Sequence, residues 1–294
     1  MTERRSEGPT PPGRSRAGLS VVVPANDEAG WIGPCLDALA AQTLDPAEID
    51  GAEVIVAANA CTDGTVAEAR AREGALAAKG WRLEVLDIPE PGKPNALNRG
   101  DAAASGAIRA YLDADVVCSP DLMRQLVEAL STDAPRYASG RLRVAPAKSW
   151  VTRRYAELWT RLPFMTEGVP GAGLFAVNAA GRARWGAFPE VISDDTFVRV
   201  QFAPEERIGV AAEYLWPMVE GWRNLVRVRR RQNRGVDEIA GRWPALMANE
   251  GKAGLGPAEV LDLALAAPTG FAVYGGVSLA VKLGGGETAW SRGR

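Results

Sequence analysis

The chain has 294 residues, enough for one large α/β domain or two small ones, and its formal net charge of −2 gives no general attraction for nucleic acid or anionic membranes. It contains no histidine, which excludes His-based triads, His-ligated zinc and imidazole bases, so acid–base or metal chemistry must depend on aspartate and glutamate. The three cysteines, Cys35, Cys61 and Cys118, contain no CxxC pair and form no disulfide framework, which favours a reduced, cytoplasmic protein.

The two ends of the sequence differ in character. Residues 1–17 are polar and rich in proline, glycine and arginine, without the apolar stretch of a secretory signal, so we expect a disordered tail. No segment reaches the roughly 18 apolar residues of a membrane-spanning helix. The nearest is Gly270–Val281, "GFAVYGGVSLAV", for which a core element and a shallow membrane contact both remain open.

The first 130 residues alternate strand patterns with helix patterns. Four runs have the length and pattern of strands: Leu19–Pro24, which is continuously apolar, then Ala52–Ala58, Arg82–Ile88 and Ala107–Asp113. A helix pattern follows each run, at residues 26–42, 62–80, 93–105 and 119–130. Such alternation predicts a mostly parallel sheet with helices on both faces.

Local signals predict where several of these helices begin and end. We expect Asp63 to cap the second helix and Gly80 to end it. Gly106 is expected to end the third helix, and Ser119, followed by Pro120, to cap the fourth.

The second half is less regular. It predicts a strand at 136–144, a helix at 150–162, and a glycine-rich loop, short strand and helix within 170–190. A helix opened by acids follows at 193–202, then a strand at 207–217 and a late helix at 256–267.

Polar residues follow three of the predicted parallel strands. They are Asn26, Asp27 and Glu28 after the first, Asn59, Cys61 and Asp63 after the second, and Asp113 and Asp115 after the fourth. Ligands of open α/β sheets bind at the carboxyl ends of the strands, so we expect a site at this edge.

Asp113 and Asp115 form a DxD pair. Alternation in an extended segment would direct both carboxylates to one side, where they suit Mg²⁺ or Mn²⁺. A solvated turn with a helix-capping acid is the alternative interpretation.

A second acidic motif is "SDDTFV", starting at Ser193. Ser193 as a helix cap would place Asp194 and Asp195 in a first turn stabilised by the helix dipole. The functional interpretation makes one of these carboxylates a general base, since histidine is absent.

Basic residues mark two further segments. Six arginines between Arg223 and Arg234 have no acid among them, which favours an anionic partner, most simply phosphate; no basic stripe with aromatic spacing indicates nucleic acid. Lys93, in "PGKPNALNRG", lies at a helix N-terminus that favours a phosphate or sugar nucleotide. The lack of a P-loop and of GxGxxG argues against an ATPase and a nicotinamide dehydrogenase.

These motifs occur in an order that resembles the inverting family 2 glycosyltransferases of the GT-A fold, over about residues 19–235. The motifs are "LSVVVPANDE", "EVIVAANACTDGT", "GKPNALNRG", "AYLDADVVCSPD", "GAGLFAVNAAG", "SDDTFV" and "RRRQNRG". The resemblance implies a single Rossmann-like, mostly parallel sheet flanked by helices, with an acceptor-side second half. It implies a catalytic domain at 18–247, divided into a nucleotide-binding half at about 18–135 and an acceptor-side half at about 136–247, before a helical, apolar extension at 248–294.

The resemblance also implies roles for individual residues. Asp195 matches the catalytic base and Asp194 its acidic neighbour, while Asp115, with Asp113, matches the metal-binding DxD. The expected donor-binding residues are Pro24, Ala25, Asn26, Glu28, Asn59, Asp63, Lys93, Asn98, Asp113, Arg231 and Arg234. The acceptor side is expected at Gly171, Ala172 and Gly173.

Two departures from the family pattern affect these expectations. Ala58 and Asn59 stand where relatives often have two acids, which leaves the base of the donor nucleotide open. Val228–Gln232, "VRRRQ", occupies the place where relatives often have "QRRRW". The missing tryptophan favours transfer of one sugar over polymer synthesis.

The resemblance implies a metal-dependent transfer of one sugar from a nucleotide-sugar donor to a hydroxyl acceptor, with inversion. We expect a UDP-sugar before a GDP-sugar, with Mg²⁺ or Mn²⁺, and a small-molecule, glycan or lipid-linked acceptor. The expected location is the cytoplasm, with a peripheral contact of residues 268–283 at the inner membrane face as a further hypothesis. A sugar-nucleotide nucleotidyltransferase and a non-catalytic sugar-nucleotide-binding protein are the alternatives.

Overall fold

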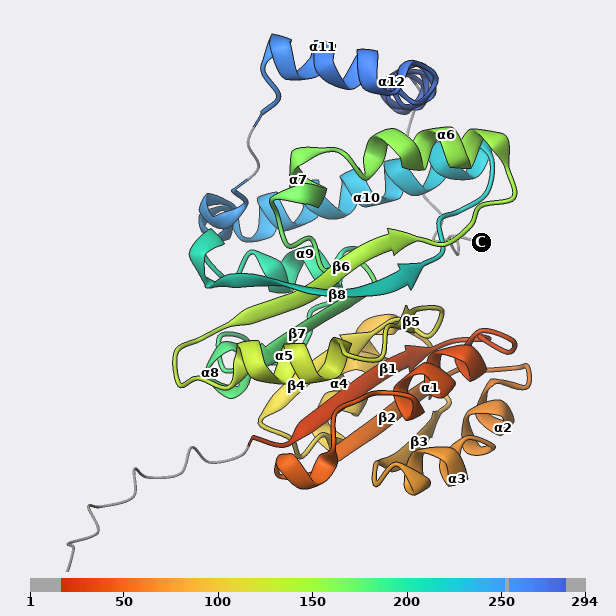
Figure 1. Cartoon of the computed structure of the whole chain (residues 1–294), viewed down its shortest axis with the longest axis vertical. Helices are drawn as coiled ribbons and strands as arrows, with labels where there is room; N and C mark the ends of the chain where they lie inside the picture. Colours follow the sequence, from red (N-terminus) through yellow and green to blue (C-terminus); the bar gives the residue numbers. More distant parts are fainter. Residues whose placement is uncertain (1–16, 252–253, 284–294) are drawn as a thin grey trace, which may run out of the picture.

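The computed structural model describes residues 17–251 and 254–283. The tail expected at residues 1–17 lies outside this range except for Ala17, as does the end of the extension beyond residue 283. Within the described residues, eight strands form one curled sheet in the order β3-β2-β1-β4-β7-β6-β8-β5, flanked by helices (Figure 1). The strands are β1 Leu19–Ala25, β2 Ala52–Asn59, β3 Arg82–Ile88, β4 Ile108–Leu112, β5 Val117–Cys118, β6 Tyr137–Val144, β7 Leu174–Asn178 and β8 Arg207–Trp216.

The predicted strands are all present, and their pairing changes along the sheet. β3, β2, β1 and β4 are parallel, as the βα alternation predicts. β7 then runs antiparallel to both β4 and β6, while β6 and β8 are parallel. The second half of the chain therefore extends the sheet of the first half through β4 and β7. The short strand β5 was not predicted.

Helices cover both faces of the sheet. They are α1 Ile32–Ala40, α2 Thr65–Arg70, α3 Glu73–Ala78, α4 Lys93–Ala103, α5 Leu122–Leu130, α6 Trp150–Trp159, α7 Pro163–Thr166, α8 Ala179–Arg182, α9 Asp194–Arg199, α10 Trp222–Arg242, α11 Pro257–Ala266 and α12 Pro268–Leu283. The 3₁₀ helices are η1 Pro46–Glu48, η2 Pro204–Glu206 and η3 Pro244–Asn249. Leu36, Leu76 and Leu126 pack into the core on one face, and Leu97, Phe197 and Phe202 into the core on the other.

Several helix predictions were wrong in detail: the helix expected at 26–42 begins only at Ile32, and the helix expected at 150–162 ends at Trp159. The helix expected at 62–80 is two helices, α2 and α3, because the chain turns at Arg72, whose side chain reaches Asp37 and the Glu68 carbonyl. α5 starts after Asp121 rather than Ser119, because the Ser119 hydroxyl accepts a hydrogen bond from the backbone of Glu213 in β8.

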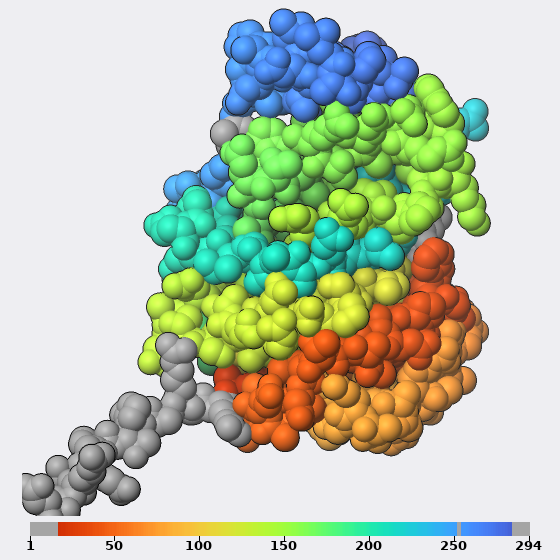
Figure 2. Space-filling view, viewed as in Figure 1, coloured from red at the N-terminus to blue at the C-terminus, as the bar shows by residue number. Residues whose placement is uncertain are grey.

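The C-terminal helices lie at one end of the molecule. α12 packs against α6 and α10, and α11 lies beside α12 (Figures 1 and 2). No residue of α11 is buried, although the helix is largely apolar. Among the described residues no single helix has the length and hydropathy to cross a membrane; α11 and α12 satisfy that test only as a pair, which is bent by 119°.

Candidate active site

The carboxyl ends of β1, β2 and β4 open into a cavity of about 1350 Å³. α9, α10 and the glycine-rich loop before β7 form other parts of its wall. Most predicted site residues line this cavity: Pro24, Ala25, Asn26, Glu28, Asn59, Lys93, Asp113, Asp115, Gly171, Ala172, Gly173, Asp194, Asp195 and Arg231.

Three predicted donor residues do not line the cavity: Asp63, Asn98 and Arg234. Asp63 instead accepts hydrogen bonds from the backbone nitrogens of Thr65 and Ala29, at 2.9 and 3.1 Å, and so joins the turns after β1 and β2. The Asn98 amide both donates to and accepts from the Phe188 backbone, at 3.0 and 2.7 Å. These two side chains hold loops beside the cavity.

The turn after β1 is tied to the turn after β2. The Asn26 side chain donates to the carbonyl oxygens of Asn59 and Ala60, at 2.8 and 3.2 Å. Asp27 and Ala60 both have positive φ, at 49° and 48°, a conformation that costs non-glycine residues energy and persists where neighbouring contacts hold it. The two turns therefore form one preshaped edge of the cavity.

The DxD segment is a turn and not the extended strand that alternation predicted. β4 ends at Leu112, and the Val116 nitrogen donates to the Asp113 carbonyl oxygen at 3.1 Å, which closes a four-residue turn. Aspartate is favoured at the first position of such turns. The Asp113 nitrogen donates to Gly173 at 2.8 Å, so the turn is anchored to the glycine-rich loop.

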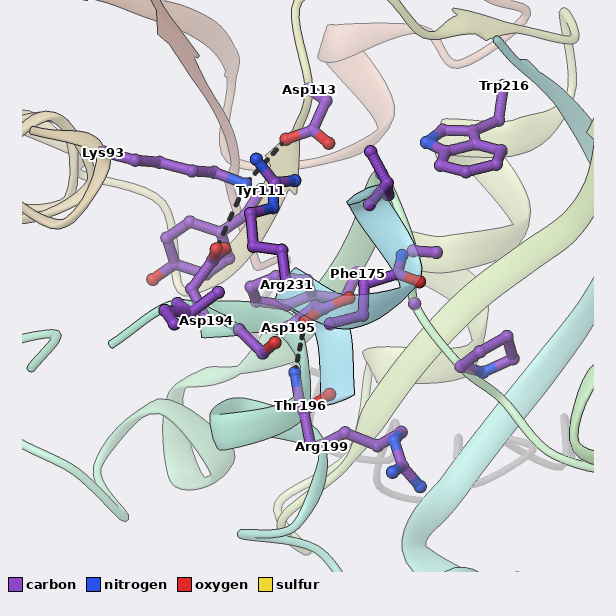
Figure 3. Close-up of a pocket in the computed structure, with 18 of the residues that line it drawn as sticks. Lys93, Tyr111, Asp113, Phe175, Asp194, Asp195, Thr196, Arg199, Trp216 and Arg231 are labelled. Carbon is purple, nitrogen blue, oxygen red and sulfur yellow. Dashed lines mark hydrogen bonds and ion pairs between the residues drawn. The ribbon is translucent and has the colours of Figure 1, made fainter. Parts of the chain in front are cut away.

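Lys93, the first residue of α4, links acidic groups from two distant parts of the chain. Its ammonium lies 3.0 Å from the Asp113 carboxylate and 3.2 Å from that of Asp194 (Figure 3). Burial disfavours the charged lysine, but the two carboxylates more than offset this effect and raise its pKa. Lys93 is therefore a firmly held cation at the centre of an acidic cluster.

Asp195 occupies the first turn of α9 and accepts a hydrogen bond from the Thr196 nitrogen at 2.7 Å (Figure 3). Burial and the adjacent charge of Asp194 raise the pKa of Asp195 to about 6, against an opposing effect of Lys93. A carboxylate with such a pKa accepts protons more readily than an ordinary aspartate does. Ser193 precedes the helix, as expected, but its side chain makes no capping bond.

The arginines of α10 divide into different roles. Burial lowers the pKa of Arg231, and the charges of Asp113, Asp194 and Asp195 oppose that shift, so its guanidinium lies within range of the acidic cluster (Figure 3). Arg229 instead donates to the Tyr155 hydroxyl, and Arg230 donates to the Ala280 carbonyl at 2.8 Å. These two arginines therefore attach α10 to α6 and α12, and Arg229 also lines the cavity.

Sequence reasoning missed part of the cavity wall. Arg199 lines it and pairs with Glu250, and the rings of Trp159 and Trp216 line it while stacked with centroids 5.7 Å apart. No local motif marks these residues, because each reaches the site through tertiary packing.

The carboxylates of Asp113 and Asp115 supply oxygen donors of the kind that Mg²⁺ and Mn²⁺ take, and these ions commonly use only one or two protein carboxylates. Within residues 17–251 and 254–283, no group of three or more Cys, Asp or Glu side chains is arranged as a complete metal site. The residues thus fit a metal whose remaining ligands come from the substrate and water.

The fold is of the GT-A type, as comparison with solved structures shows. The mannosyltransferase PcManGT from Pyrobaculum calidifontis, in complex with GDP-Man and Mn²⁺, matches 96% of this chain and 80% of its own at a TM-score of 0.55 and 21% identity. S. aureus TarS in complex with UDP-GlcNAc matches 90% of this chain and 76% of its own at a TM-score of 0.53 and 17% identity. Glucosyl-3-phosphoglycerate synthase from Mycobacterium tuberculosis, in complex with Mn²⁺, UDP and glucosyl-3-phosphoglycerate, matches 77% of this chain and 80% of its own at a TM-score of 0.52 and 21% identity.

The chain belongs to glycosyl transferase family 2, whose family model matches residues 20–184. The glycosyltransferase AglE of Haloferax volcanii is 38% identical over 103 residues, which cover 35% of this chain and 31% of that relative. The chain thus matches about a third of the length of this curated relative. The family and fold predicted from the motif order are confirmed.

Proposed function

We propose that this enzyme moves one sugar, with inversion, from a nucleotide sugar to an acceptor hydroxyl, with Asp195 as the general base. The observation that carries the proposal is Asp195 itself, a carboxylate of raised pKa on the cavity wall, beside Lys93 and Arg231. A base with a pKa near working pH takes up a proton efficiently and is still ionised before the reaction.

The step forms a bond from the acceptor oxygen to the anomeric carbon and breaks the bond from that carbon to the diphosphate. The acceptor proton passes to Asp195, and the electron pair of the broken bond leaves with the nucleoside diphosphate. Lys93 and Arg231 are the cations that stabilise the departing charge. Asp113 and Asp115 would hold a divalent metal, which when bound neutralises diphosphate charge.

The donor is proposed to be a UDP-sugar, with its nucleotide against the edge formed by Asn26 and Asn59. Solved neighbours include complexes with UDP, UDP-GlcNAc and GDP-Man, so a GDP-sugar is the alternative outcome. A thermal-shift screen of UDP, GDP and their sugars, with and without Mn²⁺, tests this choice, because a bound ligand raises the apparent stability.

The decisive experiment for the base is Asp195→Asn. We expect this variant to bind the donor normally and to lose transfer by about 10²-fold or more. Wild-type turnover by the variant would remove Asp195 from the mechanism. Donor binding by both proteins, measured by calorimetry, shows that the site is otherwise intact.

A further inference from the structure

The cavity has two halves of different chemistry. The half at the strand ends carries the acidic cluster, Lys93 and Arg231. The other half is walled by α6, α7, the end of β8 and α12, and its side chains are mainly apolar or aromatic. They include Tyr155, Trp159, Phe164, Trp216, Met218 and Tyr274.

The aromatic side chains of this second half support one another. Trp159 stacks on Trp216 and meets Phe164 edge to face, with centroids 5.7 and 5.9 Å apart. Tyr155 stacks on Tyr274 at 5.2 Å. Two charged residues that line the cavity next to these rings are Glu167, which directly follows α7, and Arg229, which donates to the Tyr155 hydroxyl. The wall therefore presents fixed ring faces and few polar groups to a ligand.

Gly173 places this apolar wall directly beside the DxD turn. Its carbonyl accepts the Asp113 nitrogen at 2.8 Å, and a Cβ at this position would lie 2.6 Å from Cδ1 of Trp216. Its φ of +76° also favours glycine. Figure 3 shows Trp216 on the far side of Asp113 from Lys93. An apolar ligand in this half would thus end near the reacting groups.

The size of the cavity allows two ligands. Its volume of about 1350 Å³ exceeds the roughly 300–1000 Å³ that is usual for one small molecule. A nucleotide sugar at the charged half leaves the aromatic half for the acceptor.

We propose that the acceptor is a hydroxyl compound carrying an apolar chain or ring system, which the aromatic half binds while its hydroxyl reaches Asp195. This inference rests on the proposed transfer reaction and specifies its acceptor. A sugar-phosphate or polysaccharide acceptor needs charged or hydrogen-bonding partners, of which this wall offers few. Burial of apolar surface would supply the binding energy.

The test measures binding of the 1-alkanols from butanol to decanol, in the presence of UDP and Mn²⁺. Tryptophan fluorescence is a direct signal, because Trp159 and Trp216 line the aromatic half of the cavity. We expect the Kd to fall about fourfold for each added methylene group until the aromatic half is filled. A Kd independent of chain length, or no binding, would overturn the proposal.

Variants of Phe164 locate the effect. Phe164→Ser should weaken decanol binding at least tenfold, and Phe164→Leu should keep the dependence on chain length. Phe271→Ser is the matched control, because Phe271 is a half-buried α12 residue that does not line the cavity. Equal loss of decanol binding in Phe271→Ser and Phe164→Ser would contradict binding of the apolar ligand in the aromatic half.

The two proposals fail separately. If the alkanols bind but neither a nucleotide nor a nucleotide sugar binds, the proposed donor chemistry is wrong. If the donor binds but the Kd of the alkanols does not depend on chain length, the proposed apolar acceptor is wrong. Farnesol supplied in buffer or in phosphatidylcholine vesicles identifies the source. Fluorescence change from both supports a membrane-held acceptor, and change from buffer alone supports a soluble one; a change from neither contradicts the proposal.

Discussion

The Lys93 ammonium lies 3.2 Å from the Asp194 carboxylate and so joins the start of α4 to the start of α9. Asp194 is nearly buried, with 10% of its side chain exposed, and its neighbour Asp195 has a raised pKa. The lysine is thus the cation that permits two adjacent carboxylates at the site, since a like charge nearby disfavours ionisation.

Replacing Lys93 with methionine should shift the pH dependence of transfer. Lys93 lowers the pKa of Asp195, so its loss raises that pKa, and the acidic limb of the kcat/KM profile should move to higher pH. We expect a shift of about one pH unit, which by itself lowers the rate at pH 7 about twofold, and a further loss of about 10-fold or more because the cation beside the proposed diphosphate site is missing. Lys148→Met, at an exposed lysine, is the control. An unmoved acidic limb would contradict the electrostatic role of Lys93.

Asp195→Asn should make the folded protein more stable at pH 7. The pKa of Asp195 is raised in the folded state, so between pH 4 and 6 the folded chain binds more protons than the unfolded chain, and stability falls as pH rises through this window. The asparagine removes that loss. We expect a higher Tm than wild type at pH 7 and an equal Tm at about pH 2.5, below the ordinary pKa of aspartate, where the side chain is protonated in both states. A lower Tm at pH 7 would show that the carboxylate is stabilised rather than strained.

Arg231 and Arg230 allow a comparison within one turn of α10. Arg231→Gln should weaken donor diphosphate binding and reduce kcat by about 10²-fold, because its guanidinium faces the carboxylates that surround the proposed diphosphate site. Arg230→Gln should leave kcat unchanged and affect only stability, because Arg230 donates to Ala280 of α12. Initial rates and donor titrations check both variants, and equal losses of kcat would refute this division.

The sequence predicted the frame of this site better than its interior. Leu19–Ala25 and Ala52–Asn59 are mostly apolar, as buried parallel strands require, so the strand ends and the polar residues after them were predictable. The turn at Asp113–Val116 was missed because strict alternation was extended past the end of β4. The motif order indicated that Asp113 and Asp195 share a site.

Other features depend on tertiary contacts that no local pattern encodes. Lys93 bridges Asp113 and Asp194 because α4 and α9 meet at the end of β4. Arg199 pairs with Glu250, which lies 51 residues further along the chain at the end of η3. Likewise, the roles of Arg230 and Arg231 differ because one side of α10 faces α12 and the other the cavity, and a run of arginines in sequence does not reveal which residue faces which.

The exposed apolar surface of α11 and α12 is consistent with the hypothesis of a membrane contact. Leu261 and Leu265 of α11 are 59% and 72% exposed, and Leu279 and Leu283 of α12 are 57% and 78% exposed. Exposed apolar patches of this kind occur where a protein meets a membrane or a partner. We propose that this surface rests on the lipid interface, where leucine side chains are favourable.

Leu265→Glu combined with Leu279→Glu should abolish co-sedimentation with phosphatidylglycerol–phosphatidylcholine vesicles, because two carboxylates cannot enter the apolar interface without a large solvation cost. Ala75→Glu with Ala78→Glu, at exposed positions of α3, adds the same charge on another surface and should leave vesicle binding unchanged. Equal binding by both double variants, or no binding by the wild-type chain, would assign the exposed leucines to something other than a membrane. Transfer measured in detergent-free buffer should be the same for both double variants, because none of the four positions lines the cavity.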